Sequence, residues 1–199
     1  MVRIIEPKVE LVTEIDAQKI MQNIETAARN CYKTENKDAE KMCRMLLEKH
    51  HEAMIEFSGD IDFLVTTDIG AQRDFSRHRH ISMACESSRF CNYSKDKFGN
   101  EITVIKPCNM EDLTEWRQCM EDVERHYMNF QGTPDQKRLM LSLSTACTFH
   151  ISANLREWRH ILRLRASKAA HPSVQWVANQ ILDIFRAKGL GLFFEDLEL

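Results

Sequence analysis

The spacing of apolar and polar positions predicts strands mainly in the first half of the chain and helices after them. Apolar residues at every second position predict strands over residues 1–12, 61–67 and 101–107, and Pro7 favours an edge strand or a bend in the first. Apolar residues at helical spacing predict helices over residues 16–31, 37–50, 68–77, 111–129, 135–150, 154–168 and 172–187.

Two further expectations concern the connections between these elements. Thr66 or Thr67 is the expected cap of the short helix over 68–77. Residues 78–100 are polar and show no periodicity, which predicts a long loop of the kind that often carries function. With no repeat and no linker in view, we expect one domain over residues 1–199. Its fold class is α/β in the broad sense (α+β), with a small mixed or antiparallel sheet packed with several helices.

Composition changes this picture in three ways. The 199 residues are 43% hydrophobic and 29% charged, so the chain can bury a core. The net charge of −3 and a pI near 6.2 argue against a general nucleic-acid binder, and the apolar runs are too short to span a membrane. The seven cysteines form no CxxC pair, and the start of the chain does not resemble a signal peptide, so we expect free thiols in the cytoplasm.

The most unusual segment is an arginine-rich stretch inside the predicted loop. It begins with Arg77-His78-Arg79-His80 and continues through small hydroxyl side chains to Arg89. Guanidinium groups bind phosphate through paired hydrogen bonds, and serine hydroxyls can complete such a site. The stretch therefore indicates a site for an anionic ligand, although a solvated basic loop would have the same composition.

Two other chemistries are weaker interpretations of the same stretch. A metal bound by His78, His80, Cys85 and Cys91 is disfavoured because the spacing matches no closed zinc pattern and the flanking arginines repel a cation. We therefore predict no metal. Cys85 is a candidate nucleophile because neighbouring arginines would lower the pKa of its thiol, but an uninvolved thiol is the commoner case.

The predicted helix over 154–168 carries a second signal. Asn154, Trp158, Ile161, Leu162 and Arg165 fall on one stripe. The apolar members favour the core, so an unpaired charge on Arg165 would be costly at the end of this stripe. Its partner is expected to be either a protein carboxylate or the anion of a ligand.

A third, weaker signal lies between the predicted helix over 37–50 and the strand over 61–67. His50, His51, Glu52 and Glu56 lie where side chains often reach a pocket, but a structural or solvated role is equally open. With six glycines in all, the chain has no Gly-rich phosphate loop, so a bound flavin or nucleotide would not be held as in a Rossmann fold.

The arginine-rich stretch also carries a family resemblance. Arg77-His78-Arg79, seven further residues and then Ser87 resemble the RHRx7S signature of the flavin-dependent thymidylate synthases. Four other segments resemble family segments in the same order, and they are ETAARNCYKTE (25–35), HHEAMIEF (50–57), KRLMLSLS (137–144) and NLREWRHILRLRASKAAHPSVQ (154–175). The resemblance extends from about residue 20 to residue 180.

The resemblance implies a fold, a reaction and an assembly. The fold would be that of the family, in a homotetramer with FAD bound at subunit interfaces. The reaction would transfer a one-carbon unit from methylenetetrahydrofolate to dUMP, after NADPH has reduced the flavin. The resemblance also implies that no cysteine acts as the nucleophile. From charge and composition, we expect neither a nucleic-acid polymer nor a membrane among the partners.

Site residues follow from the resemblance position by position. The flavin would be contacted by His51, Arg77, His78, Arg79, Asn154 and His160. The nucleotide would lie near Glu56 and would be contacted by Arg73, Asp74, Glu86, Ser87, Ser88, Arg89, Arg138 and Arg165. Of these residues, Ser87 and Arg165 are the expected catalytic pair.

The departures from the family pattern leave alternatives open. Met54, Phe57, Phe90 and Ser142 replace usual residues, while Asp74 and Cys85 do so close to the expected nucleotide. One alternative is a family member with altered pyrimidine or one-carbon chemistry, and another is a flavoprotein without activity. A third, from a different class, is a single-stranded nucleic-acid binding module in which Phe90 and Tyr93 stack on bases.

Overall fold

The computed structural model describes residues 2–33 and 38–197. Its larger sheet contains β2 (Lys8–Leu11), β3 (Asp60–Asp68), β6 (Ala146–Asn154) and β4 (Ser82–Cys85), antiparallel in that order. A smaller sheet pairs β1 (Arg3–Ile5) with β5 (Thr103–Ile105) in parallel.

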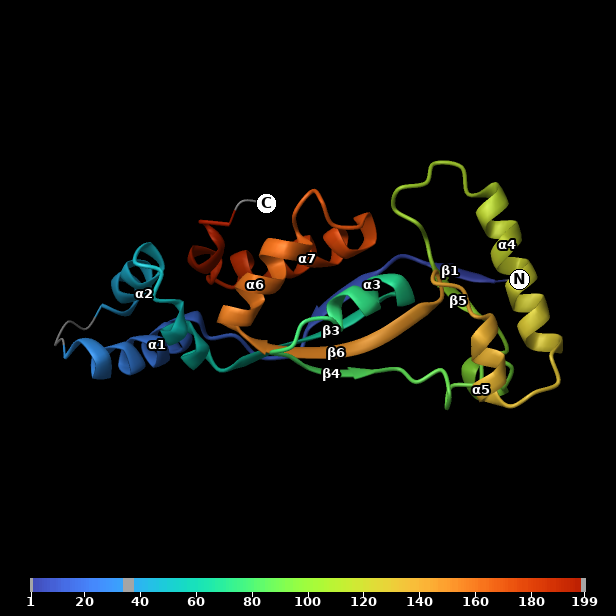
Figure 1. The fold of residues 1–199 in the computed structure, drawn as a ribbon, viewed down its shortest axis with the longest axis horizontal. Helices are drawn as coiled ribbons and strands as arrows, with labels where there is room; N and C mark the ends of the chain where they lie inside the picture. Colours follow the sequence, from blue (N-terminus) through green and yellow to red (C-terminus); the bar gives the residue numbers. More distant parts are fainter. Residues whose placement is uncertain (1, 34–37, 198–199) are drawn as a thin grey trace.

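The helices lie in three groups around these sheets (Figure 1). One face of the larger sheet is covered by α3 (Ile69–Phe75), α6 (Leu155–Arg165) and α7 (Pro172–Ala187). One end of the molecule carries α1 (Ala17–Tyr32) and α2 (Ala39–Glu48), and the other carries α4 (Thr114–Asn129) and α5 (Pro134–Lys137). Short 3-10 turns complete the chain as η1 (Glu52–Ser58), η2 (Asp96–Phe98), η3 (Arg138–Met140) and η4 (Gly191–Phe194).

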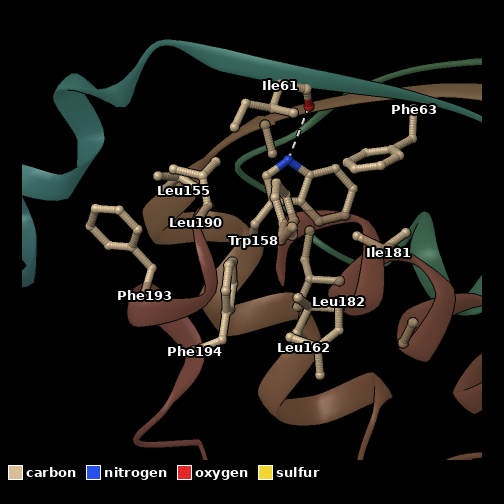
Figure 2. Close-up of a cluster of buried hydrophobic side chains, with 14 of the residues drawn as sticks. Ile61, Phe63, Leu155, Trp158, Leu162, Ile181, Leu182, Leu190, Phe193 and Phe194 are labelled. Carbon is tan, nitrogen blue, oxygen red and sulfur yellow. Dashed lines mark hydrogen bonds between the residues drawn. The ribbon is translucent and has the colours of Figure 1, made fainter. Parts of the chain in front are cut away.

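Strict alternation along β3 and β6 builds the main core. Phe63 on β3 and Ile151 on β6 are register partners and are fully buried, while the polar residues between buried positions face the other side of the sheet. Trp158 of α6 packs edge-on against Phe63 and Phe185. Its indole N–H donates to the carbonyl of Ile61 at 3.0 Å, as Figure 2 shows. This contact fixes α6 near the end of the sheet at which β3 begins and β6 ends.

A second, smaller core lies at the α4 end of the molecule. Val2, Ile102, Val104, Met120 and Tyr127 form it, with Tyr93 among the residues packed around it. The two cores explain the elongated outline in Figure 1.

The sequence-based fold class is confirmed as a mixture of strands and helices with an antiparallel main sheet. The expected helices near 16–31, 37–50, 111–129, 154–168 and 172–187 are all present. Pro7 does divide the first strand into β1 and β2. Residues 1, 34–35 and 37, which belong to expected elements or motifs, lie outside the described residues. In the part of the chain that is described, no helix combines the length and apolar character needed to cross a bilayer.

Three expectations about local structure are wrong. The predicted helix over 135–150 is instead the short α5 and η3 followed by β6. The predicted loop over 78–100 contains β4, which pairs with β6, and η2. The cap of α3 is Asp68 rather than a threonine, because its carboxylate accepts the N–H of Ala71 at 2.7 Å.

Candidate functional site

The end of β6 and the start of α6 build one wall of a concave surface that we call the groove. Asn154 ends the strand and caps the helix, with its side-chain oxygen accepting the N–H of Glu157 at 3.0 Å. The facing wall is the turn between α3 and β4, which carries Arg77, His78 and Arg79. Residues far apart in the sequence thus meet because β4 pairs with β6.

The groove consists of two adjoining cavities that share His80, Glu157 and His160. The first has a volume of about 580 Å³ and extends past Asn154 to η1 and Arg163. The second has a volume of about 660 Å³ and is lined by Arg77, His78, Arg79, His80, Glu157, His160, Leu164, Arg165, Ser167, Ala169 and Ala170. Five of the six expected flavin contacts therefore line one continuous surface, namely Arg77, His78, Arg79, Asn154 and His160.

His78 is the buried histidine of the groove, with a side chain only 3% exposed. The guanidinium Nε–H of Arg165 donates to its Nε2 at 3.1 Å, so the ring proton must lie on Nδ1. That nitrogen faces Oε1 of Glu157 at 3.6 Å. Burial, together with the positive charges of Arg165 and His160, lowers the pKa of His78 from 6.5 to about 4. The ring is therefore neutral at pH 7, and burial raises the pKa of Glu157 in turn.

Arg165 lies at the end of the buried stripe, as expected, and it has protein partners. Its Nη2 donates to the carbonyl oxygen of Asp74 at 2.7 Å, and its Nη1 lies 3.6 Å from the Asp74 carboxylate. The side chain is 18% exposed and lines the groove. The sequence left open whether the partner of Arg165 would be a protein carboxylate or a ligand anion, and the structure shows a protein carboxylate, that of Asp74. The contacts with His78 and Asp74 orient the guanidinium toward the groove.

The chemistry of the groove fits an anion better than a cation. His78, Glu157 and His160 offer ligand atoms that lie within 4.8 Å of one another. However, Nε2 of His78 already accepts from Arg165 and Nδ1 carries the proton, so neither nitrogen offers a metal a free lone pair. The neighbouring guanidinium would also repel a cation. The cysteines considered for a metal site do not belong to this group.

Cys85 differs from its sequence-based expectation. Its thiol accepts an N–H of Gln72 at 3.2 Å, and burial raises its pKa, whereas neighbouring arginines were expected to lower it. Burial also raises the pKa of the Cys91 thiol, and the negative charge of Glu86 raises it further. Both are free thiols that stay protonated at neutral pH, which speaks against a cysteine nucleophile.

Arg159 of α6 is completely buried, and no sequence pattern singled it out. Its guanidinium donates to both carboxylate oxygens of Asp196 at 2.7 Å and to Glu52 at 3.0 Å, and also to the carbonyl of Phe193. Arg159 thereby joins the C-terminal η4 segment to Glu52 on the groove wall. Sequence reasoning missed it because its partners come from distant parts of the chain.

A second group of expected residues forms what we call the arm, made of residues 86–94, α5 and Arg138. Nε of Arg89 lies 3.0 Å from Oδ1 of Asp135, and Nε of Arg138 lies 3.8 Å from the same oxygen. The two arginines are 60% and 41% exposed. They converge on one carboxylate and remain open to solvent.

The start of the arm is held by hydrogen bonds to its own loop and to β6. The N–H of Glu86 donates to the carbonyl of Thr148 at 2.9 Å, and the hydroxyl of Tyr93 donates to the Glu86 carboxylate at 2.7 Å. The carbonyl of Ser87 accepts two backbone N–H groups at 2.9 Å each, and Ser88 is half-buried beside it. This loop lies toward the Ala146 end of β6, about 20 Å along the strand from Asn154.

Two expected site residues, His51 and Arg73, lie outside the lining of the groove. His51 stacks on Tyr32 with ring centroids 5.9 Å apart and also forms a hydrogen bond with the Tyr32 hydroxyl. Its neighbour Glu52 lines the groove, whereas His51 itself does not appear among the lining residues. Arg73 is exposed on α3 and does not line either cavity. The structure thus brings most expected flavin contacts together. Of the expected nucleotide contacts, Arg165 lines the groove with Asp74 as its partner, Arg73 lies apart, and the others lie in the arm.

Relatives with solved structures share this fold. Thymidylate synthase X of Helicobacter pylori, solved with FAD and dUMP, aligns with a TM-score of 0.77 at 18% identity, covering 97% of this chain and 100% of that one. A UMP/dUMP methylase of Streptomyces cacaoi bound with 5-Br UMP also aligns with a TM-score of 0.77, at 20% identity, covering 96% and 94% of the two chains.

Sequence relatives agree with these structures. The flavin-dependent thymidylate synthase of Corynebacterium efficiens is 23% identical over 214 residues, covering 94% of this chain and 84% of that protein. The enzyme of the same name from Pyrobaculum aerophilum is 31% identical over 133 residues, covering 66% and 51%. The family model described as thymidylate synthase complementing protein matches residues 10–188. The chain therefore belongs to this family, whose members named above are flavin-dependent thymidylate synthases.

Proposed function

We propose that this chain is a flavin-dependent thymidylate synthase that converts dUMP to dTMP, with FAD as cofactor and with methylenetetrahydrofolate and NADPH as co-substrates. The observation that carries the proposal is the convergence of Arg77, His78, Arg79, His160 and Arg165 on one cavity. Sequence resemblance selected these residues, and the cavity was no part of that selection. Their convergence therefore supports the proposal independently.

The donors of the groove fit the cofactor. Arg77 and Arg79 are exposed and offer two-point hydrogen bonds to a pyrophosphate. His78 is neutral, so it adds no second charge beside Arg165. When bound, the flavin supplies the hydride that NADPH first delivers to it. The residues of the chain bind and orient the cofactor and exclude water from the reacting atoms.

The expected nucleotide contacts give Arg165 and the arm separate roles. Arg165, aimed by His78 and Asp74, orients the nucleotide against the flavin. The arginines of the arm hold the phosphate, and Ser87 lies at the start of the same loop. Since the arm and the Asn154 end of the groove lie well apart along β6, we propose that arm and groove of different copies meet in a homotetramer. We also propose a single functional domain working in the cytoplasm.

The experiment begins with the purified protein and FAD. We expect a yellow complex, and FAD at about a hundred times its dissociation constant should add roughly 2.7 kcal/mol to the free energy of unfolding. Addition of dUMP, methylenetetrahydrofolate and NADPH should then yield dTMP. A protein that stays colourless, with an unchanged melting temperature, would exclude the flavin assignment. Flavin binding with turnover of UMP in place of dUMP would instead support the altered-pyrimidine alternative.

A further inference from the structure

Lys137 is a buried cation that belongs neither to the two hydrophobic cores nor to the groove. The residue is 6% exposed, and the structure gives it no ion pair within the described parts of the chain, 2–33 and 38–197. Its ammonium donates to the hydroxyl of Ser94 at 2.8 Å and lies 5.2 Å from the centre of the Tyr127 ring. Burying a charge without a carboxylate is costly, and a hydroxyl and an aromatic face offset only part of that cost. The position therefore requires an explanation beyond packing.

The contacts of Lys137 lead directly to the arm. The hydroxyl proton of Ser94 goes to the side chain of Asn92, at 2.7 Å, so the hydroxyl is free to accept from the lysine. The preceding N–H, that of Tyr93, donates to the hydroxyl of Tyr127 at 3.2 Å. The Tyr93 hydroxyl in turn holds Glu86, which precedes Ser87. Lys137 and Tyr127 together anchor the far end of the loop whose near end carries Ser87 and Arg89.

The helix α5 holds this loop at two points. Asp135 pairs with Arg89 near the start of the loop, and Lys137 holds Ser94 at its end. The capping box between Thr133 and Gln136 fixes the single turn on which both residues lie. An ammonium carries three N–H donors, and only one is matched by an acceptor here. The ammonium thus belongs to the same short segment as Asp135 and Arg138, and among the described residues it forms no ion pair with a carboxylate.

We infer that Lys137 is a positioning residue for the nucleotide. It fixes the loop of residues 87–94 against α5, and so holds Arg89 of that loop in position to receive the phosphate. This inference rests on the proposed function in one respect, because dUMP is the anion whose binding the loop serves. The ordering of the loop itself does not depend on that function.

The test compares Lys137→Met with Lys95→Met in the holoenzyme. Methionine keeps an unbranched stem and removes the charge and the donors, while the control removes the same charge from an exposed position next to Ser94. For Lys137→Met we expect KM for dUMP to rise tenfold or more, with kcat and FAD affinity within twofold. Lys95→Met should stay within twofold in all three, and Lys137→Arg should recover most of the lost affinity.

A second measurement follows amide hydrogen exchange of residues 87–94 in the protein without nucleotide. Lys137→Met should accelerate exchange there, and Lys95→Met should not. Faster exchange in a chain whose wild type binds no dUMP would refute the proposed function while leaving the role of Lys137 in the loop intact. Unchanged exchange and unchanged KM would overturn the inference, as would a parallel fall in dUMP affinity, FAD affinity and melting temperature. If Lys137→Met does not fold, Ser94→Ala should still raise KM about threefold, and no rise would overturn the inference.

Discussion

The groove and the arm both contain arginines expected to contact the nucleotide, but these arginines differ in burial and in the number of their hydrogen-bond partners. In the groove, Arg165 is 18% exposed and its donors are matched by His78 and Asp74. In the arm, Arg89 and Arg138 are largely exposed and share one carboxylate, Asp135. Arg165 is thus fixed before any ligand arrives, whereas the arm relies on weak ion pairs that an incoming anion can replace.

This difference assigns separate physical tasks to the two regions. A guanidinium fixed by buried partners keeps its orientation, which suits a group that aligns reacting atoms. Exposed arginines on a loop can adjust to a phosphate and release it again. The comparison predicts that substitutions in the groove change both binding and stability, while substitutions in the arm change binding alone.

The largest effect is expected for Arg165→Ala. Loss of a charge-assisted contact in a half-buried site should weaken dUMP binding by about 2–5 kcal/mol. The ligand-free protein should also lose about 1–3 kcal/mol of unfolding free energy, because His78 and the Asp74 carbonyl lose their donor. Nucleotide titration and chemical denaturation measure the two quantities.

A matched control for this substitution is Arg186→Ala on α7. Arg186 is 55% exposed and, among the described residues, its side chain pairs with Asp183 alone, at 3.2 Å, so both quantities should change by less than about 0.5 kcal/mol. If Arg165→Ala leaves dUMP affinity intact while destabilising the protein, Arg165 is part of a structural ion pair. The nucleotide would then depend on the arm alone.

A pH-dependent effect of intermediate size is expected from His78. Its folded-state pKa of about 4 lies below the ordinary 6.5, so the unfolded chain binds a proton that the folded protein refuses. The folded state is therefore unaffected by this group above pH 6.5 and loses stability as the pH falls from 6.5 toward 4. The loss should reach at most about 3.5 kcal/mol, since each pKa unit corresponds to about 1.4 kcal/mol.

The measurement is chemical denaturation across that pH range for the wild type and for His78→Gln. Glu157 has a raised pKa and contributes with the opposite sign, but it is present in both proteins, so the difference isolates His78. His126→Gln on the exposed side of α4 is the control and should retain the wild-type slope. A His78→Gln protein with an unchanged slope would show that His78 is solvated.

The sequence predicted the helices well and failed for two paired strands. Residues 137–144 are rich in apolar residues that fit a helix, but Leu139 and Leu143 are exposed, at 79% and 57%. The buried positions of β6 follow instead the two-residue period that begins at Cys147. The strand β4 has only four residues and is defined by its pairing with β6. Because β6 was predicted as part of a helix, β4 had no predicted partner and was predicted as part of a loop.

The site shows a similar boundary between what sequence can and cannot predict. The stripe on α6 correctly predicted that Arg165 would need a partner, because helical spacing is local information. That Asp74 and His78 would be those partners depends on how α3 packs beside α6, which spacing does not encode. Arg159 lay outside the predicted stripe, and its burial depends on Asp196 near the end of the chain.

The smallest effect is expected for Asp135→Asn in the arm. Asp135 is 59% exposed, and its ion pairs with Arg89 and Arg138 are open to solvent, so the free energy of unfolding should change by less than about 1 kcal/mol. The amide keeps the size of the side chain but no longer competes with a phosphate for the two arginines. Binding of dUMP should therefore strengthen two- to fivefold, and nucleotide titration would detect it.

Salt sharpens this last prediction, because interactions between exposed charges are largely screened beyond about 10 Å at 0.1 M salt and already beyond about 3 Å at 1 M. The gain from Asp135→Asn should be largest at low salt and should vanish near 1 M. The control is Asp122→Asn on α4, which removes an exposed carboxylate paired with Arg125 at 2.8 Å and should leave dUMP binding unchanged. Weaker binding by Asp135→Asn would mean that the carboxylate holds the arginines in place for the phosphate. The arm would then be as preorganised as the groove, and the contrast between the two regions would fail.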